Sequence, residues 1–225
     1  MNPQELKNLS DAQDRTTESR IYFILLRGVP LSTPDLLHAV ATLTINIAQQ
    51  ATPEQLEKYH PVLQPKICLR AKNPNNLRNM IEEARYFAEV PTASLTHDGD
   101  IYAAAIGPIP ADEVTATLKR GQVFHAFAEG FPNLPYAPPT IQSNDPTLNI
   151  YYRTDIDIPI GKLVAQVGHA AWTAIRQRPS TNSINITLIP SDATSIRNLD
   201  DAHVIWDAGR TVFNEPTMTT AAQWR

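Results

Sequence analysis

The sequence contains a single cysteine, Cys68, among 225 residues, which excludes a disulfide bond within the chain. Cys68 lies inside the apolar run KICLRA, where we expect a buried structural thiol rather than a nucleophile. The N-terminal residues lack the apolar stretch of a signal peptide, and no later run is long and apolar enough to cross a membrane. These absences predict a cytoplasmic protein.

An excess of positive charge is also absent, because the net charge is −4 at pH 7. The chain as a whole therefore has no basic field that would attract nucleic acid or an anionic membrane. The charge is unevenly distributed: from Leu148 onward seven basic residues balance seven acidic ones, so the whole acidic excess precedes Leu148. An electrostatic footprint for nucleic acid is thus expected only as a local patch in the C-terminal part.

The N-terminal half alternates between apolar runs and helical patterns. Residues 1–19 are polar and charged, as in a flexible leader or a frayed helix. The run RIYFILL at 20–26 is short, apolar and rich in β-branched and aromatic residues, which predicts a strand covered on both faces. The elements predicted next are helices over 32–50, 52–60 and 73–90, a strand over 65–71, and two further strands with an Asp-Gly turn at 98–99.

The same order of elements returns after the proline-rich segment 129–147, which predicts a stiff linker. Strands are predicted over 148–155, 183–190, 202–209 and 217–224, with helices over 161–176 and 191–201. We interpret the repeated order as an internal duplication. The predicted fold is α/β, with two tandem units at 20–128 and 148–225, each a mixed four-stranded sheet with helices packed on it.

The stretch GKLVAQVGHAAW places three polar residues on one face of a predicted helix. Lys162, Gln166 and His169 fall at i, i+4 and i+7, so their side chains form one stripe. The opposite stripe is apolar and small, and we expect it to lie on a sheet. Taken alone, a polar helical stripe is usually solvated surface.

A second polar stretch, WDAGRTVFNEPTMTT, follows a predicted strand. Asp207 ends that strand, and Gly209 permits a tight turn that is costly for other residues. Arg210 carries a guanidinium suited to phosphate, while Thr211 and Thr219 add hydroxyl donors. The carboxyl ends of strands are where α/β sheets usually bind their ligands.

Together, IGKLVAQVGHAA, DAGRT and the Thr217/Thr219 pair resemble the archaeal and eukaryotic type of peptidyl-tRNA hydrolase. The family pattern is Gly-Lys-x-x-x-Gln-x-x-His-Ala on the helix after the first strand, then Asp-Ala-Gly-Arg-Thr, then a threonine eight residues later. The resemblance implies hydrolysis of the ester bond between a peptide and the 3′ end of tRNA, without a metal or cofactor. It implies catalytic roles for Lys162, His169, Asp207, Thr211 and Thr219. Substrate binding is expected from Gln166, Arg210, Gly209 and Arg153.

Ester hydrolysis needs an activated water and donors that stabilise the oxyanion. On the implied site, Asp207 would orient the water, and Lys162 or the threonine hydroxyls would stabilise the oxyanion. Arg210 would meet a tRNA phosphate, and Arg153 approaches from the first strand of its unit. The expected partner is peptidyl-tRNA.

By the same resemblance, the N-terminal unit is a degenerate copy. Asp35, Ala39 and Thr42 occupy the places of the lysine, glutamine and histidine, and the glycine turn has shrunk to HDGD. Members of the family commonly form homodimers. The chain is therefore expected to be a monomer that is an internal pseudo-dimer, or else a homodimer.

The C-terminal unit departs from the family pattern at its end. Pro216 stands where the family has a glycine, and TAAQWR follows Thr219 in place of a longer apolar strand. We therefore expect a shortened last strand and a weaker sheet beside the site. A second function class stays open, namely a non-catalytic relative that binds tRNA, a small ligand or a protein. The complete motif favours the hydrolase, and the acidic net charge and shortened strand favour the relative.

Overall fold

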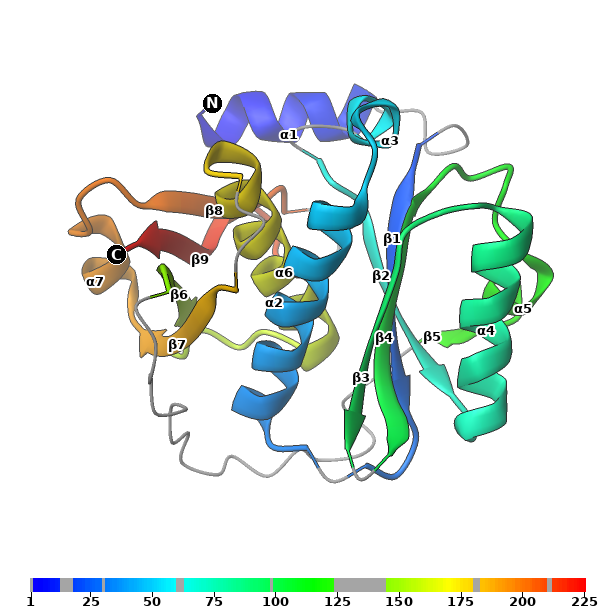
Figure 1. Cartoon of the computed structure of the whole chain (residues 1–225). Coiled ribbons are helices and arrows are strands. Elements are labelled where there is room, and N and C mark those ends of the chain that lie inside the picture. The colour runs from blue at the N-terminus through cyan, green and yellow to red at the C-terminus, as the bar shows by residue number, and fades with distance from the viewer. Residues whose placement is uncertain are drawn as a thin grey trace. The chain divides into compact units, whose positions relative to one another are not determined.

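The computed structural model describes residues 2–12, 18–29, 31–59, 63–97, 99–123, 145–179, 183–209 and 212–225. The chain forms two compact units, each treated separately below. Unit 1 comprises Met1–Gln13, Leu31–Ile45 and Ala126–Arg225, and unit 2 comprises Asp14–Pro30 and Asn46–His125. The fold is α/β as predicted, with one mixed sheet in each unit and helices packed on it (Figure 1).

Unit 2 is built on a five-stranded sheet. Its strands are β1 (Arg20–Leu26), β2 (Lys66–Ala71), β3 (Thr92–His97), β4 (Asp100–Ile109) and β5 (Gln122–Val123), in the order β3-β4-β1-β2-β5. β1 pairs in parallel with β2 and antiparallel with β4, which in turn pairs antiparallel with β3. All the residues of β1 except its two ends are buried, which confirms a strand covered on both faces.

The helices of unit 2 begin at the polar residues that the sequence provides as caps. α3 (Pro53–Lys58) begins with a reciprocal capping box between Thr52 and Gln55, and α5 is the single turn Ala116–Lys119. α4 (Pro74–Phe87) begins after Asn73, whose side chain accepts from the Asn76 backbone. α4 lies on one face of the sheet and buries a single stripe there (Figure 1). That stripe consists of Leu77, Met80, Ile81 and Ala84.

Unit 1 is built on a four-stranded sheet of order β7-β6-β9-β8. Its strands are β6 (Thr147–Arg153), β7 (Asn185–Ser191), β8 (His203–Asp207) and β9 (Thr217–Trp224). The short helix α7 (Ala193–Arg197) packs Ile196 on one face of this sheet, against Tyr151 and Met218. α6 (Ile160–Gln177) covers the other face, where Trp224 donates from Nε1 to the Ala174 carbonyl over 3.2 Å.

The two sheets have the same topology, which supports the predicted duplication. The order β2-β1-β4-β3 in unit 2 corresponds to β7-β6-β9-β8 in unit 1. In each sheet the first strand in sequence pairs in parallel with the second and antiparallel with the fourth. Unit 2 differs from the prediction by its additional two-residue strand β5, which pairs with β2.

The predicted last strand over 217–224 forms as β9, with the bounds that the sequence indicated. β9 has eight residues and lies between β6 and β8, pairing with both. Its register with β6 runs from Thr220 opposite Tyr152 to Trp224 opposite Leu148. A strand with a partner on each side has its ladder hydrogen bonds satisfied, so the sheet beside the site is continuous.

The N-terminal residues include a helix, α1 (Pro3–Ala12), so a helix rather than a flexible segment occupies most of the predicted leader. The predicted helix over 32–50 forms as α2 (Thr33–Gln50). Residues 129–144 of the predicted linker lie outside the described residues, and β6 begins at Thr147. Within the described ranges, no helix is both long enough and apolar enough to span a membrane.

Candidate active site

α6 directs one residue of its polar stripe, Gln166, to the sheet. Lys162, Gln166 and His169 lie on α6 as expected, but Gln166 is buried and contacts residues of β8 and β9. The small apolar side chains, among them Val164 and Val167, are buried as well. The apolar stripe is buried as expected, and the polar stripe is not simply solvated surface, because Gln166 is enclosed against the sheet.

The turn after β8 holds the Asp207 carboxylate in place. Gly209 donates its backbone N–H to Asp207 Oδ1 over 2.9 Å. Gly209 has a φ of +74°, and a Cβ added there would lie 2.4 Å from the Glu215 carbonyl carbon. Only glycine tolerates both the positive φ and the close Glu215 backbone, which explains the glycine in the DAGRT motif.

An irregularity in β9 brings two adjacent threonines to α6. Ile205 pairs with Thr220 while Trp206 pairs with Met218, so Thr219 is an extra residue in β9. β-bulges of this kind re-aim side chains and are common beside functional sites. Thr219 Oγ1 donates to Gln166 Oε1 over 2.9 Å, and Thr220 Oγ1 donates to the Gln166 backbone carbonyl over 3.1 Å.

These contacts join four motif residues into one polar chain: Lys162, Asp207, Gln166 and Thr219. Gln166 Nε2 donates to Asp207 Oδ2 over 3.0 Å, and Lys162 forms an ion pair with the same oxygen. Asp207 is 4% exposed and Thr219 fully buried, whereas the Lys162 side chain is 22% exposed. The polar chain thus runs from the interior to the surface and ends in an ammonium group.

The other predicted site residues are His169, Arg210, Thr211 and Arg153. His169 is half-buried, one turn beyond Gln166 on the same helix. Arg210 and Thr211 lie outside the described residues.

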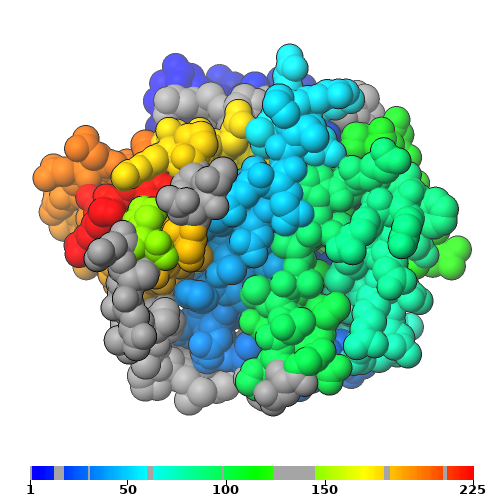
Figure 2. All heavy atoms as spheres, in the orientation of Figure 1, coloured from blue at the N-terminus to red at the C-terminus, as the bar shows by residue number. Residues whose placement is uncertain are grey.

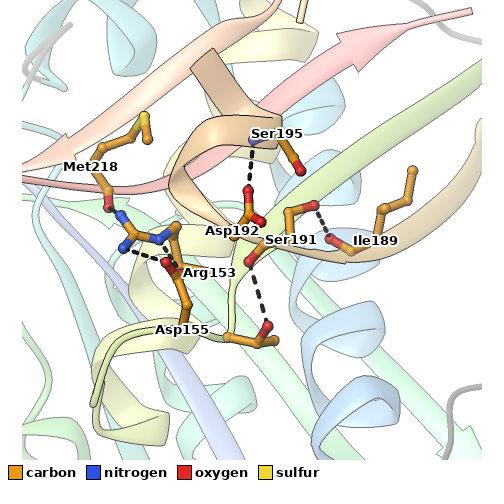
Figure 3. Close-up of polar contacts among 8 residues, drawn as sticks. Arg153, Asp155, Ile189, Ser191, Asp192, Ser195 and Met218 are labelled. Atoms are coloured by element: carbon orange, nitrogen blue, oxygen red, sulfur yellow. Dashed lines mark hydrogen bonds and ion pairs between the residues drawn. The ribbon is translucent and has the colours of Figure 1, made fainter. Parts of the chain in front are cut away.

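Arg153 has a separate environment at the end of β6 (Figure 3). Its guanidinium forms a bidentate pair with Asp155 and donates from Nη1 to the Met218 carbonyl over 3.1 Å. Arg153 lies two residues after Tyr151 on the strand, so both side chains are on the same face of the sheet. Tyr151 packs against Ile196 of α7, which makes this the α7 face. α6, which carries Lys162, covers the opposite face. The structure therefore does not bring Arg153 into the polar chain.

Thr220 is a site residue that the sequence reasoning missed. It is fully buried, and its hydroxyl anchors the α6 backbone at Gln166. Two consecutive threonines in a strand normally point to opposite faces, so only the bulge turns both toward the helix. The signal available in the sequence was the Thr-Thr pair itself.

In the N-terminal repeat, the three positions that correspond to the lysine, glutamine and histidine of α6 do not form a comparable polar chain. Asp35 accepts a hydrogen bond from Ser32 Oγ and so belongs to the cap of α2. Ala39 is buried, and Thr42 donates to the carbonyl of His38 on the same helix. These polar groups are engaged in local helix contacts.

No protein-family model matches the sequence, and a search of curated proteins returns no match. Within the described residues, no three His, Cys, Asp or Glu side chains are grouped as metal ligands require.

Proposed function

We propose that the chain is a peptidyl-tRNA hydrolase whose site is the end of the polar chain at Lys162. The observation that carries the proposal is the convergence of two motif blocks on one connected set of contacts. Gln166 and Asp207 lie 41 positions apart, and Gln166 and Thr219 lie 53 apart, yet both pairs are hydrogen-bonded in the interior of unit 1. In a buried polar network every donor and acceptor must have a hydrogen-bond partner, and this requirement supports a functional site rather than a solvated helix face.

The polar chain assigns different roles to its members. Lys162 is the exposed member, so its ammonium is the group that contacts the ester and stabilises the oxyanion formed when water attacks the carbonyl. Asp207 holds this ammonium, and its Oδ1, which accepts from Gly209, keeps a lone pair able to orient a water. Thr219 and Gln166 are enclosed and act as positioning residues.

The reaction needs no further reactant. Water adds to the ester carbonyl, the tetrahedral intermediate collapses, and the bond to the ribose oxygen breaks. One proton of the water goes to that oxygen and the other is released to solvent, so the products are the tRNA hydroxyl and the peptide carboxylate. A preorganised cation beside the carbonyl lowers the barrier because it is already oriented when the charge develops.

The test is release of free tRNA from an N-acetyl-aminoacyl-tRNA. Lys162→Ala and Asp207→Asn are each expected to lower kcat about 100-fold or more, the range found on removal of an oxyanion donor. Matched controls are Lys58→Ala and Asp100→Asn, which remove exposed ion-pair partners in unit 2 and should leave turnover unchanged. A wild-type chain without turnover, or variants that keep it, would overturn the proposal.

The second candidate function is non-catalytic binding of tRNA or a smaller ligand. The observation that favours it is the enclosure of Asp207, which leaves little of its carboxylate to meet a substrate. Binding of tRNA by the wild-type chain without any ester cleavage is the result that would select this candidate.

A further inference from the structure

Two consecutive aromatic residues at the end of α4 are exposed. Tyr86 is 76% exposed and Phe87 82%, more than any other large hydrophobic residue in the described chain. Single exposed apolar residues are common, whereas two large aromatic rings exposed at one helix end are a candidate contact site.

The fold of unit 2 does not use these rings. α4 is held to the sheet by its buried stripe, of which Ala84 is the last member. Tyr86 and Phe87 follow that stripe at the C-terminal end of the helix, before the Ala88 cap. α3 and α4 both contribute to the molecular surface in the space-filling view, in cyan and teal (Figure 2).

Carboxylates flank the aromatic pair in sequence. Glu82 lies four residues before Tyr86, hence beside it on the helix, and Glu89 follows two residues after Phe87. Glu83 lies four residues before Phe87, and its carboxylate accepts a hydrogen bond from Thr117 Oγ1 over 2.7 Å. The Glu89 backbone carbonyl accepts from Gln55 Nε2 over 3.3 Å, which brings α3 to the same end of α4.

The acidic character extends to α3 and the turn after β4. Lys58 Nζ donates to the Glu54 carboxylate over 2.8 Å, which raises the pKa of Lys58, and Glu113 and Asp112 act in the same direction. α3 also contacts β4, the strand that precedes this turn. Segments 53–58, 82–89 and 110–113 together hold seven carboxylates and two basic residues, Lys58 and Arg85. We call these three segments, which include Tyr86 and Phe87, the α4-end surface.

We propose that the α4-end surface binds a lysine- and arginine-rich segment of a partner protein, with an apolar side chain of that segment packed on Tyr86 and Phe87. Binding interfaces are enriched in aromatic residues at their core and have a polar rim. The acidic surroundings repel nucleic-acid phosphates, an anionic membrane and a second copy of the same surface. A basic segment gains both apolar burial and complementary charge.

The experiment uses a phage-displayed library of random 12-residue peptides, selected on the wild-type chain and counter-selected on the double variant Y86S/F87S. The enriched peptides are expected to combine lysine or arginine with a large apolar residue. Fluorescence anisotropy of the most enriched peptide should show binding weakened about tenfold in Y86S/F87S, as for loss of a hot spot. In E82K/E89K, binding should weaken and its salt dependence should fall.

Val123→Ser is the matched control, because Val123 is an exposed apolar residue of β5 outside the α4-end surface. It should bind the peptide like the wild type, and all variants should keep the wild-type melting temperature. Failure to enrich any peptide, enrichment of acidic peptides, or equal binding by Y86S/F87S would overturn the proposal. Self-association or tRNA binding that Y86S/F87S abolishes would also overturn it. Ester cleavage should not change in Y86S/F87S, so this test is independent of the proposed hydrolase.

Discussion

Gln166 of α6 donates a hydrogen bond of 3.0 Å to Oδ2 of Asp207, at the end of β8. The contact determines the orientation of the glutamine side chain, because a carboxylate only accepts and therefore must face the Nε2 group. Oε1 is then left to accept from Thr219, as observed. The sequence resemblance implied a binding role for Gln166, whereas its enclosure makes it a link between the two halves of the candidate site.

The two adjacent threonines of β9 provide a matched pair of variants. Thr219→Val and Thr220→Val each remove one buried hydrogen bond to Gln166 and should each lower the free energy of unfolding by about 1–3 kcal/mol. Only Thr219 contacts the Gln166 carboxamide, so only Thr219→Val should also lower kcat about tenfold or more, with KM little changed. Urea unfolding and N-acetyl-aminoacyl-tRNA cleavage measure the two effects, and equal loss of kcat in both variants would contradict the polar chain.

Gly209→Ala should destabilise the chain more than Gly99→Ala does. Both glycines have positive φ, +74° and +86°, so alanine at either position costs roughly 1–2 kcal/mol in backbone strain. A Cβ at Gly99 meets nothing within 4 Å, whereas one at Gly209 lies 2.4 Å from the Glu215 backbone and adds about 1–3 kcal/mol of overlap. Equal unfolding free energies for the two variants would show that the turn accommodates a side chain.

Lys162→Ala should reduce the salt dependence of tRNA binding. If the Lys162 ammonium is near a phosphate in the complex, its removal lowers the slope of log K against log salt concentration by about 1. Filter binding of deacylated tRNA at several salt concentrations measures the slope, with Lys58→Ala as the control outside the site. An unchanged slope in Lys162→Ala would place the phosphates elsewhere.

Cys68 should be unreactive in the folded chain at pH 8. Cys68 is half-buried, and desolvation raises the pKa of its thiol to about 12, so almost no thiolate is present at that pH. The raised pKa means that the folded chain holds the thiol proton more tightly than the unfolded chain does. The thiol therefore contributes its full stabilisation below the unfolded pKa of about 9, and this contribution is lost as pH rises from about 9 toward 12. Labelling with a chromogenic disulfide should be slow at pH 8 and fast in denaturant, and Cys68→Ala should remove part of the alkaline loss of stability. Rapid labelling of the folded chain would disprove the burial.

Most elements of the fold could be predicted from local sequence. The run at 20–26 forms β1, and the polar caps Thr52 and Asn73 start α3 and α4. These elements follow from side-chain periodicity and capping, which depend on residues close in sequence. The two-residue strand β5 was not predicted, because so short a segment has no period and forms only by pairing with β2.

The bounds of β9 follow from the run TMTTAAQW, whereas its partners could not be predicted. Strand pairing depends on residues far apart in sequence, and β9 pairs with β6 up to Trp224 and with β8 up to Ala222. The burial of Gln166 was likewise missed, since helical periodicity separates polar from apolar faces without showing what either face meets.

The sequence by itself determined the α/β class, the repeated order of elements and the two motif blocks, because each depends on local spacing and composition. Tertiary structure alone decided which motif residues meet. The polar chain of Lys162, Asp207, Gln166 and Thr219 forms because α6 packs across β8 and β9 and a bulge turns Thr219 toward α6. Arg153 instead lies on the other face of the sheet. Contacts between residues more than 40 positions apart arise from the packing of whole elements, for which local pattern carries no signal.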